Sequence, residues 1–182
     1  MDEIIKAKIR KSENNEENRF YKNICSPFSY EPTKDKFKII NTNNYGEGVI
    51  SLTLFSPGDT VFVFTGTIVP VQTLMTLQIT PGRYILDDIV MGKVLHSCNP
   101  NMDCDINNLV FRARKYIKPG EFLTMDYDTT EDVLFQSFTC ECGEEDCRVT
   151  IAGRKIKSGS SRLDKIDYIK SNKKEEVINV MD

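Results

Sequence analysis

The chain has 182 residues, of which 40% are hydrophobic and 28% charged, and this suits one domain with a core of ordinary size. Its 24 Lys and Arg residues against 27 Asp and Glu residues give a formal net charge of -3, so the basic surplus typical of nucleic-acid-binding domains is missing. No apolar run approaches the ~20 residues of a membrane span, and the first residues resemble neither a signal peptide nor a transit peptide. We therefore expect an intracellular protein, nuclear or cytoplasmic, that binds neither nucleic acid nor membranes and keeps its cysteines reduced.

The pattern along the chain predicts mostly strands. Residues 1–36 are polar and interrupted by prolines, which indicates an arm and an irregular lead-in. Residues 71–79 fit either a strand or one helical turn. Stretches rich in β-branched and aromatic residues, separated by Gly and Pro turns, predict strands at 37–40, 48–55, 60–69, 84–86, 109–114 and 122–127. Many short strands with little helix predict a mainly β domain.

Three cysteines lie close together near the end of this region, at Cys140, Cys142 and Cys147. Gly143 suits the tight backbone of a metal-binding turn. Structural zinc takes four ligands in a tetrahedron, and Cys98 is the candidate for the fourth. A disulfide or unligated thiols are the alternatives, and a reducing compartment favours zinc over a disulfide. Cys25 and Cys104 are interpreted as ordinary small apolar residues.

Two residues are candidates for chemistry. His96 is the only histidine, but no Gly-rich nucleophile turn accompanies it, so a hydrogen-bonded structural role is the simpler interpretation. Tyr127 follows Asp126 at the end of an apolar strand, where a buried phenol needs a partner and can orient a substrate. Core packing is the alternative for Tyr127.

Four short motifs occur in order: Gly-Glu-Gly at 46–48, His-Ser-Cys-Asn-Pro-Asn at 96–101, Gly-Glu-Phe-Leu-Thr-Met-Asp-Tyr at 120–127 and the cysteine cluster at 140–147. They resemble, in turn, the Gly-x-Gly cofactor loop, the Asn-His-Ser-Cys-x-Pro-Asn signature, the Gly-Glu-Glu-Leu-Thr-x-Asp-Tyr motif and the post-SET cysteines of SET-domain lysine methyltransferases. The resemblance covers residues ~37 to 153, and four motifs in the family's order are a specific signal.

The resemblance implies a SET-domain, β-clip-like fold of several small sheets, in which the C-terminal segment threads beneath a loop like a pseudoknot. It divides the chain into a lead-in (1–36), a SET domain (37–135), a post-SET zinc segment (136–153) and a polar tail (154–182). The implied zinc ligands are Cys98, Cys140, Cys142 and Cys147.

The resemblance also implies S-adenosylmethionine as the cofactor. The glycine loop is expected to hold it through backbone groups, His96 to lie beside the adenine mainly through main-chain contacts, and Phe138 to cover the adenine. Tyr127 is the expected catalytic residue, which aligns the lysine amine with the methyl sulfonium. The expected cofactor-binding residues are Gly46, Glu47, Gly48, Tyr84, Leu95, His96, Tyr127 and Phe138.

The expected reaction is methyl transfer to a lysine of a basic protein or peptide, either a histone or another protein. The amine must be neutral, whereas a free lysine titrates near ~10.4. A narrow apolar channel desolvates the ammonium and lowers its pKa, so alignment and electrostatics suffice without a strong base.

The chain departs from the family at three places. Leu95 replaces an asparagine that contacts the cofactor, so weaker cofactor binding is expected. The segment between Ile68 and His96 is short, which implies a shortened substrate groove or a need for a partner. Met125 occupies the position that tunes the number of methyl groups, and its flexibility favours more than one. The alternatives are a SET-like interaction or regulatory module without turnover, and a SET-fold enzyme that acts on a small molecule.

Overall fold

The computed structural model describes residues 16–156, so the polar stretches at 1–15 and 157–182, with their helical spacings, lie outside the described residues. Between them the chain is mainly β, as predicted, with two short 3-10 helices, η1 (Met91–Lys93) and η2 (Tyr127–Thr129). None of the described helices has the length and apolar character to cross a membrane. The strands are β1 (Phe37–Thr42), β2 (Gly46–Ser51), β3 (Thr60–Val63), β4 (Thr67–Val69), β5 (Thr76–Thr80), β6 (Arg83–Leu86), β7 (Leu95–His96), β8 (Met102–Asp105), β9 (Val110–Ala113), β10 (Thr124–Met125), β11 (Phe138–Thr139) and β12 (Thr150–Ile151).

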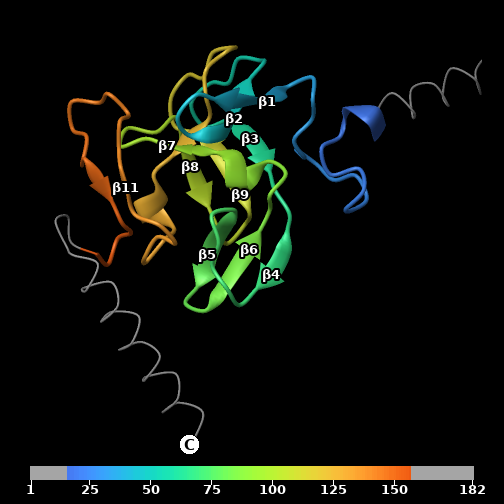
Figure 1. Ribbon diagram of the computed structural model, residues 1–182. Coiled ribbons are helices and arrows are strands. Elements are labelled where there is room, and N and C mark those ends of the chain that lie inside the picture. Colours follow the sequence, from blue (N-terminus) through green and yellow to red (C-terminus); the bar gives the residue numbers. More distant parts are fainter. Residues whose placement is uncertain (1–15, 157–182) are drawn as a thin grey trace, which may run out of the picture.

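These strands form several small sheets, which confirms the predicted fold class. The antiparallel sheets have the orders β1-β2, β3-β9-β8, β4-β6-β5 and β11-β12, and β10 pairs with β7 in parallel. Figure 1 shows β1 and β2 at one end of the molecule and β4, β5 and β6 at the other, with β3, β8 and β9 between them. The segment that carries β11 lies on the side opposite the N-terminal lead-in.

The segment that leads into β10 passes between two segments that precede it in the sequence, those around Val49 and Leu95. The N–H of Leu123 donates to the carbonyl of Val49 at 2.8 Å, and the carbonyl of Leu123 accepts from the N–H of Leu95 at 3.2 Å. The side chain of Asn101 closes the arrangement, because its Nδ2 donates to the carbonyl of Phe122 at 2.8 Å. This threading beneath the 96–101 turn is the arrangement that the resemblance predicts.

Aromatic side chains fill the main core. Phe62 and Phe111 are fully buried, and their ring centroids lie 4.9 Å apart across the β3-β9 pair. Phe64 packs on Phe111 at 5.3 Å, and Phe37 meets Phe62 edge-on at 5.5 Å. The alternating apolar residues of the predicted strands therefore converge on one aromatic centre.

Three strand predictions need correction. The stretch 48–55 was expected as one strand, but β2 ends at Ser51, and Phe55 forms only an isolated bridge with Ile117. The stretch 60–69 was expected as one strand, but β3 and β4 are separate and belong to different sheets. Gly66 lies at the break, where an added Cβ would stand 2.2 Å from the carbonyl oxygen of Leu86, so the backbone turns there at close range. The stretch 122–127 forms only the two-residue β10, because Tyr127 already begins η2.

The ambiguous segment 71–79 is also resolved. Its second half is β5, which pairs with β6, and its first half is a turn in which the Thr73 N–H donates to Thr76 Oγ1 at 2.9 Å. The strands β7, β8, β11 and β12 were not predicted. Three of them, β7, β11 and β12, have only 2 residues each, too few to show a period, whereas the Met-Asp-Cys-Asp of β8 does alternate apolar and polar residues.

The lead-in supports the loop that precedes η1. The hydroxyl of Tyr21 donates to the Asp87 carboxylate at 2.5 Å, and both side chains are buried. The same carboxylate accepts from the N–H groups of Ile89 at 2.8 Å and Met91 at 2.9 Å. Residues before the predicted SET boundary therefore hold the start of η1 in place.

Candidate functional site

A cavity of about 300 Å³ lies beside η1 and the turn between β1 and β2. Five of the eight residues predicted to bind the cofactor line it, and they come from separate stretches of the chain: Gly46, Glu47, Leu95, Tyr127 and Phe138. Met125, two positions before Tyr127, lines it as well. The volume lies at the lower end of the range for small-molecule sites.

Tyr127 presents a fixed, neutral phenol to this cavity. Its hydroxyl donates to the carbonyl of Val94 at 2.8 Å. Its ring packs against those of His96 and Phe138, with ring centroids 5.1 Å and 6.1 Å away, and these two rings also contact each other at 5.7 Å. Burial, with a smaller contribution from the charge of Glu131, raises the pKa of Tyr127, so the hydroxyl stays protonated and acts as a donor.

His96 supports Tyr127 from outside the cavity wall. Its Nδ1 accepts from the backbone N–H of Tyr127 at 3.3 Å, and its Nε2 lies 3.5 Å from Cys98 Sγ. Burial lowers the pKa of His96 to about 4, although the charge of Asp126 opposes the shift, so the ring is neutral. Since Nδ1 accepts, the ring proton is on Nε2 and faces the sulfur. His96 thus has the hydrogen-bonded structural role that the residues alone favoured.

The two glycines of the predicted cofactor loop do different work. Gly46 closes the turn between β1 and β2 with a φ of 72°, and it lines the cavity. Gly48 does not line it; an added Cβ would stand 2.8 Å from the Phe122 ring and 3.1 Å from Leu95. Gly48 therefore permits the close packing of β2 on the threaded segment. Glu47 forms an ion pair with Lys93 of η1, which ties the loop to the far side of the cavity.

Tyr84 is not brought to this site. It lies in β6, paired with Val69 of β4 and Gln78 of β5, and it is absent from the cavity lining among the described residues. Its contact with a cofactor stays a prediction, and the geometry gives it no support.

The predicted metal ligands do converge. Four sulfurs all lie within 4.8 Å of one another, those of Cys98, Cys140, Cys142 and Cys147. The sulfurs of Cys98 and Cys140 are 3.9 Å apart. A tetrahedron with Zn–S bonds of ~2.3 Å has sulfurs ~3.8 Å apart, so the spacing fits zinc. All six cysteines lie in the described region, and none of them is paired in a disulfide there.

The surroundings act in opposite directions on two of the sulfurs: burial and the neighbouring thiols raise the pKa of Cys140, whereas that of Cys142 is lowered. Cys98 Sγ accepts from the Arg148 N–H at 3.4 Å and faces the Nε2 of His96. Burial opposes ionisation of Cys142, yet hydrogen bonds from the Cys98 and Glu144 backbone and from the neighbouring thiols lower its pKa to about 6. Metal binding requires deprotonated thiols, so these hydrogen bonds prepare the cluster for a cation.

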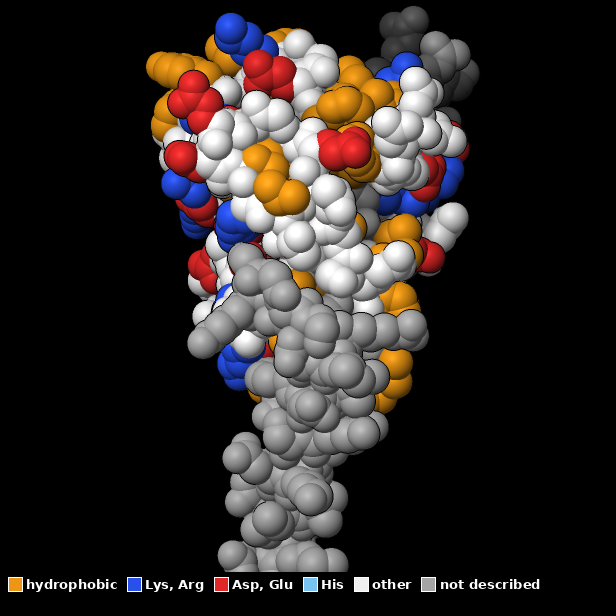
Figure 2. Space-filling view, turned by 60° about the vertical axis from the view of Figure 1, so that its left-hand side comes forward, with side chains coloured by type: hydrophobic (Ala, Val, Ile, Leu, Met, Phe, Trp, Pro, Cys, Tyr) orange, Lys and Arg blue, Asp and Glu red, His pale blue; other side chains and the backbone are white. Residues whose placement is uncertain are grey.

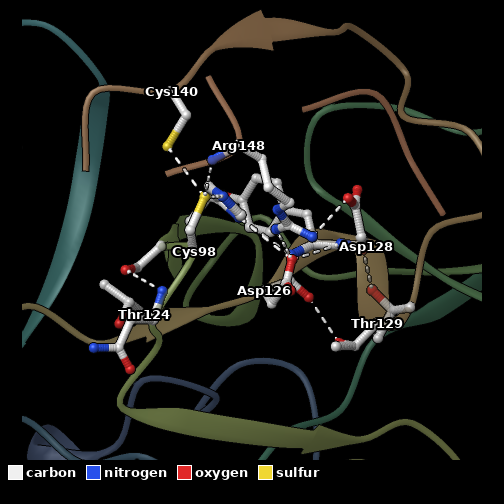
Figure 3. Close-up of polar contacts among 12 residues, drawn as sticks. Cys98, Thr124, Asp126, Asp128, Thr129, Cys140 and Arg148 are labelled. Atoms are coloured by element: carbon white, nitrogen blue, oxygen red, sulfur yellow. Dashed lines mark hydrogen bonds and ion pairs between the residues drawn. The ribbon is translucent and has the colours of Figure 1, made fainter. Parts of the chain in front are cut away.

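Arg148 connects the cysteine cluster to the turn that carries Tyr127. Its guanidinium donates to Asp126 at 2.5 Å and to Asp128 at 2.9 Å, so it bonds the residues on both sides of Tyr127 (Figure 3). The Asp126 side chain also accepts from the Asp128 N–H at 3.1 Å and caps η2. One arginine next to the cysteine cluster therefore restrains the turn that carries Tyr127.

Sequence reasoning missed the polar wall of the cavity. Glu131, Gln72 and Thr76 line it, and Gln72 donates to Glu131 at 2.6 Å across 59 residues of sequence. No motif includes these residues, and an acidic residue such as Glu131 is normally expected at the protein surface. Its neighbours Asp132 and Leu134 are buried as well, and the apolar Leu134 is a signal in the sequence that this segment packs inward.

Comparison with known proteins places the chain in a family. A model of the SET domain matches residues 3–128, which is more than half of the chain. Methyltransferase flvH of Aspergillus flavus is 33% identical over 88 residues, 46% of this chain and 48% of that protein. Histone-lysine N-methyltransferase met-2 of Caenorhabditis elegans is 38% identical over 80 residues, 37% of this chain and 6% of that protein. The chain thus spans about half or less of these curated relatives.

Solved structures share the fold. KRYPTONITE in complex with mCHG DNA and SAH superimposes with a TM-score of 0.53 at 22% identity, over 69% of this chain and 30% of that one. Its complex with mCHH DNA, H3(1-15) peptide and SAH gives a TM-score of 0.51 at 22% identity over the same shares of 69% and 30%. Arabidopsis thaliana SUVH6 in complex with SAM gives 0.52 at 20% identity, over 63% of this chain and 32% of that one. Because the SET-domain model matches more than half of its residues, the chain belongs to the SET-domain family.

Proposed function

We propose that the chain is an S-adenosylmethionine-dependent methyltransferase that modifies a lysine side chain of a protein or peptide, and that zinc bound by the four cysteines stabilises its C-terminal segment. The observation that carries the proposal is the neutral Tyr127 hydroxyl, fixed on Val94 in a cavity lined by the predicted cofactor residues. The relatives and neighbours named for methyltransferase activity and for bound SAM or SAH support the same cofactor class.

When bound, S-adenosylmethionine supplies the methyl group on its sulfonium. The residues of this chain contribute position and desolvation. Tyr127 holds its hydroxyl at one place because its backbone is bonded to His96 and its side chain to Val94. Apolar walls from Met91, Met125 and other residues favour the neutral amine that must attack. When the methyl sulfonium and the lysine amine are held in line, methyl transfer is accelerated by this alignment, and no strong base is required.

A peptide substrate agrees with the rim of the cavity. Leu74 and Phe135 line the cavity, yet they are 64% and 55% exposed, so apolar side chains surround its mouth. An apolar rim around the cavity suits the residues that flank a lysine in a peptide better than a free small amine. The named activity of met-2 and the H3(1-15) peptide in the KRYPTONITE complex point to histone tails as the first peptides to try.

DNA is the less favoured partner, although the two KRYPTONITE neighbours contain it. The formal net charge of this chain is -3. The side of the molecule that carries β11 has acidic as well as basic side chains among exposed hydrophobic ones (Figure 2). Mixed charge suits a peptide surface better than a phosphate backbone.

The test combines binding and turnover. Calorimetric titration of the zinc-loaded protein with S-adenosylmethionine and S-adenosylhomocysteine is expected to give micromolar binding of both. Radiolabelled cofactor is then offered with a panel of basic peptides, including histone H3 tails, and separately with small alkyl amines. Methylation of peptides in preference to amines supports the proposal, and the reverse preference supports a small-molecule enzyme.

Tyr127→Phe is the matched control for this experiment. The change removes only the hydroxyl, so folding and zinc content are expected to persist while kcat falls by about a hundredfold or more. Unchanged turnover would remove Tyr127 from the mechanism. Absence of cofactor binding in zinc-loaded wild-type protein would favour the interaction module without turnover.

A further inference from the structure

The described part of the chain ends beside the cavity. The carbonyl of Ala152 accepts from the N–H of Leu134 at 2.8 Å, and Leu134 lines the cavity. The N–H of Arg154 donates to the carbonyl of Glu131, another lining residue, at 2.9 Å. Figure 1 shows this end of the described chain on the side of the molecule that carries β11. The residues that follow Ile156 therefore start close to the cavity.

Two ion pairs fix the place where the chain leaves. Arg154 Nε lies 2.7 Å from Asp132 Oδ1, and Lys155 Nζ lies 3.0 Å from Asp132 Oδ2. The Asp132 side chain is only 8% exposed, so both pairs are partly shielded from water. Gly153 permits the close approach of the two segments, because an added Cβ there would stand 2.6 Å from the carbonyl oxygen of Asp132. The last described residues are thus held on the wall of the cavity.

The mouth of the cavity is apolar and exposed. Leu74 and Phe135 line the cavity and are 64% and 55% exposed, and Val71, next to the lining residue Gln72, is 66% exposed. Covering such side chains with apolar groups removes their surface from water and is favourable. A segment that suits this mouth therefore carries apolar residues on both sides of the side chain that it inserts.

The sequence after Ile156 offers one lysine with such neighbours. Leu163 lies two positions before Lys165, and Ile166 directly follows it. No other lysine of this segment has an apolar residue within two positions on both sides; Lys170, for example, is followed by a serine and an asparagine. The segment contains five lysines in all, Lys157, Lys165, Lys170, Lys173 and Lys174.

The length of the chain also favours Lys165. It lies nine residues beyond Ile156, and nine extended residues span up to ~30 Å, whereas the four residues from Ala152 to Ile156 span at most ~14 Å. The chain before Lys157 is held on the wall by the ion pairs of Asp132, so it cannot lie across the mouth. Lysines farther along have a longer tether, and the effective concentration of a tethered group falls with tether length.

We infer that Lys165 is a modification site: its side chain enters the cavity of its own chain and is methylated there. The inference rests on the proposed function, since it uses the same cavity and cofactor. The ammonium first loses a proton to solvent, and the neutral nitrogen attacks the methyl carbon of S-adenosylmethionine. The N–C bond forms as the C–S bond breaks, the positive charge passes from sulfur to nitrogen, and S-adenosylhomocysteine leaves. Because a tethered lysine has an effective concentration of about a millimolar, it competes with peptide substrates.

The experiment follows methyl transfer without any added substrate. Zinc-loaded protein with all 182 residues is incubated with methyl-labelled S-adenosylmethionine, and its proteolytic fragments are analysed by mass spectrometry. The label is expected on the fragment that contains Lys165. The rate constant per chain is expected to stay the same when the protein is diluted about a hundredfold, because the reaction occurs within one chain.

Two variants locate the modified lysine. Lys165→Arg is expected to abolish labelling of the segment, and Lys170→Arg, the matched control, is expected to keep it. Both changes preserve the positive charge and lie outside the zinc cluster and the cavity lining of the described residues. Zinc content and titration with S-adenosylhomocysteine check that each variant retains both sites. Tyr127→Phe is expected to show no label on the chain.

Three results would overturn the inference. The first is an unlabelled chain under conditions in which an added basic peptide is methylated. The second is a label that persists in Lys165→Arg or lies on another lysine in the wild-type chain. The third is a rate constant that falls in proportion to protein concentration, which would mean that one chain modifies another. If neither the chain nor any peptide is methylated, the proposed function fails and the inference fails with it.

Discussion

The two hydrophobic clusters of the molecule are held together by different forces. The main cluster joins most of the strands and contains fully buried aromatic rings, among them Phe62 and Phe111. The second cluster has only three buried members, Leu134, Cys140 and Ile151, with the remaining cysteines of the metal site around them. Apolar burial can stabilise the first cluster by itself, whereas the second is too small and needs the metal and polar ties.

Tyr127 packs against both clusters. Its place in the cavity therefore depends on how the cysteine segment docks on the aromatic core. A fold that only needed stability could do without the second cluster. A fold that needs Tyr127 fixed between Val94 and His96 needs both.

Removing a ring from the main cluster is the change with the largest expected effect. Phe111→Ala deletes a fully buried side chain that contacts Phe62 and Phe64, and truncations of this kind cost about 3–5 kcal/mol. Chemical denaturation measures the loss in the free energy of unfolding. Tyr116→Ala is the control, because Tyr116 is 62% exposed and its loss is expected to cost less than about 1 kcal/mol. Equal costs for the two variants would contradict this account of the core.

Removing a metal ligand should separate the two clusters. Cys142→Ser is expected to lower the zinc content from about one per chain to none, since a hydroxyl cannot replace a thiolate ligand. Hydrogen exchange should then accelerate at residues 138–153 while the β3-β9-β8 sheet keeps its protection. Chelation of the wild-type metal should reproduce the effect.

Cys25→Ser tests whether a cysteine change alone has this effect. Cys25 lies in the lead-in, away from the four-sulfur cluster, and its substitution should leave both zinc and the exchange of residues 138–153 unchanged. Loss of protection across the whole chain in Cys142→Ser would show that the clusters are not independent.

The same contrast explains what the sequence could predict. Cys140 and Cys147 are close because they are near each other in sequence, and the match of Cys98 and Tyr127 to known motifs supplied the rest of the site. Glu131 could not be found in this way, because its partners Gln72 and Gln78 lie 59 and 53 residues away and belong to no motif. Its burial arises from tertiary packing, which no local pattern records.

Strand ends were predicted less well for a related reason. The β-rich stretch at 60–69 fits one strand locally, and only the close approach of Gly66 to Leu86 breaks it into β3 and β4. The motif predicts that Gly48 contacts the cofactor, which stays a prediction; in the structure an added Cβ at Gly48 would meet Phe122, which is distant in sequence. In both cases the glycine is needed because a residue distant in the sequence packs closely against it, and the local sequence does not show this contact.

The third prediction concerns Arg148, which connects the cysteine cluster to the turn that carries Tyr127. Arg148→Lys keeps the charge but loses the fork that bonds Asp126 and Asp128 together. We expect a loss of about 1–2 kcal/mol in the free energy of unfolding and a lower kcat, since the turn that carries Tyr127 is less restrained. Arg114→Lys is the matched control, because Arg114 and Asp103 form an exposed pair at 3.8 Å that should contribute little. Equal effects of the two lysine variants would mean that Arg148 does not position the turn.

The smallest effect is expected at the surface contact that spans both regions. Tyr45, in the turn between β1 and β2, donates its hydroxyl to the carboxylate of Glu141, which lies between the first two zinc cysteines, at 2.8 Å. The acceptor, Glu141, raises the pKa of Tyr45. Because Tyr45 is 53% exposed and also lines the cavity, the contact closes one edge of the cofactor site without contributing much to stability.

Tyr45→Phe should leave the midpoint of thermal unfolding almost unchanged and speed the dissociation of S-adenosylhomocysteine by about two- to threefold, as measured by stopped-flow fluorescence. Tyr45→Phe and Glu141→Ala combined should be no faster than the single variants, because both remove the same bond. An additive effect would show that the two regions meet through other contacts and that this one does not restrain the cofactor.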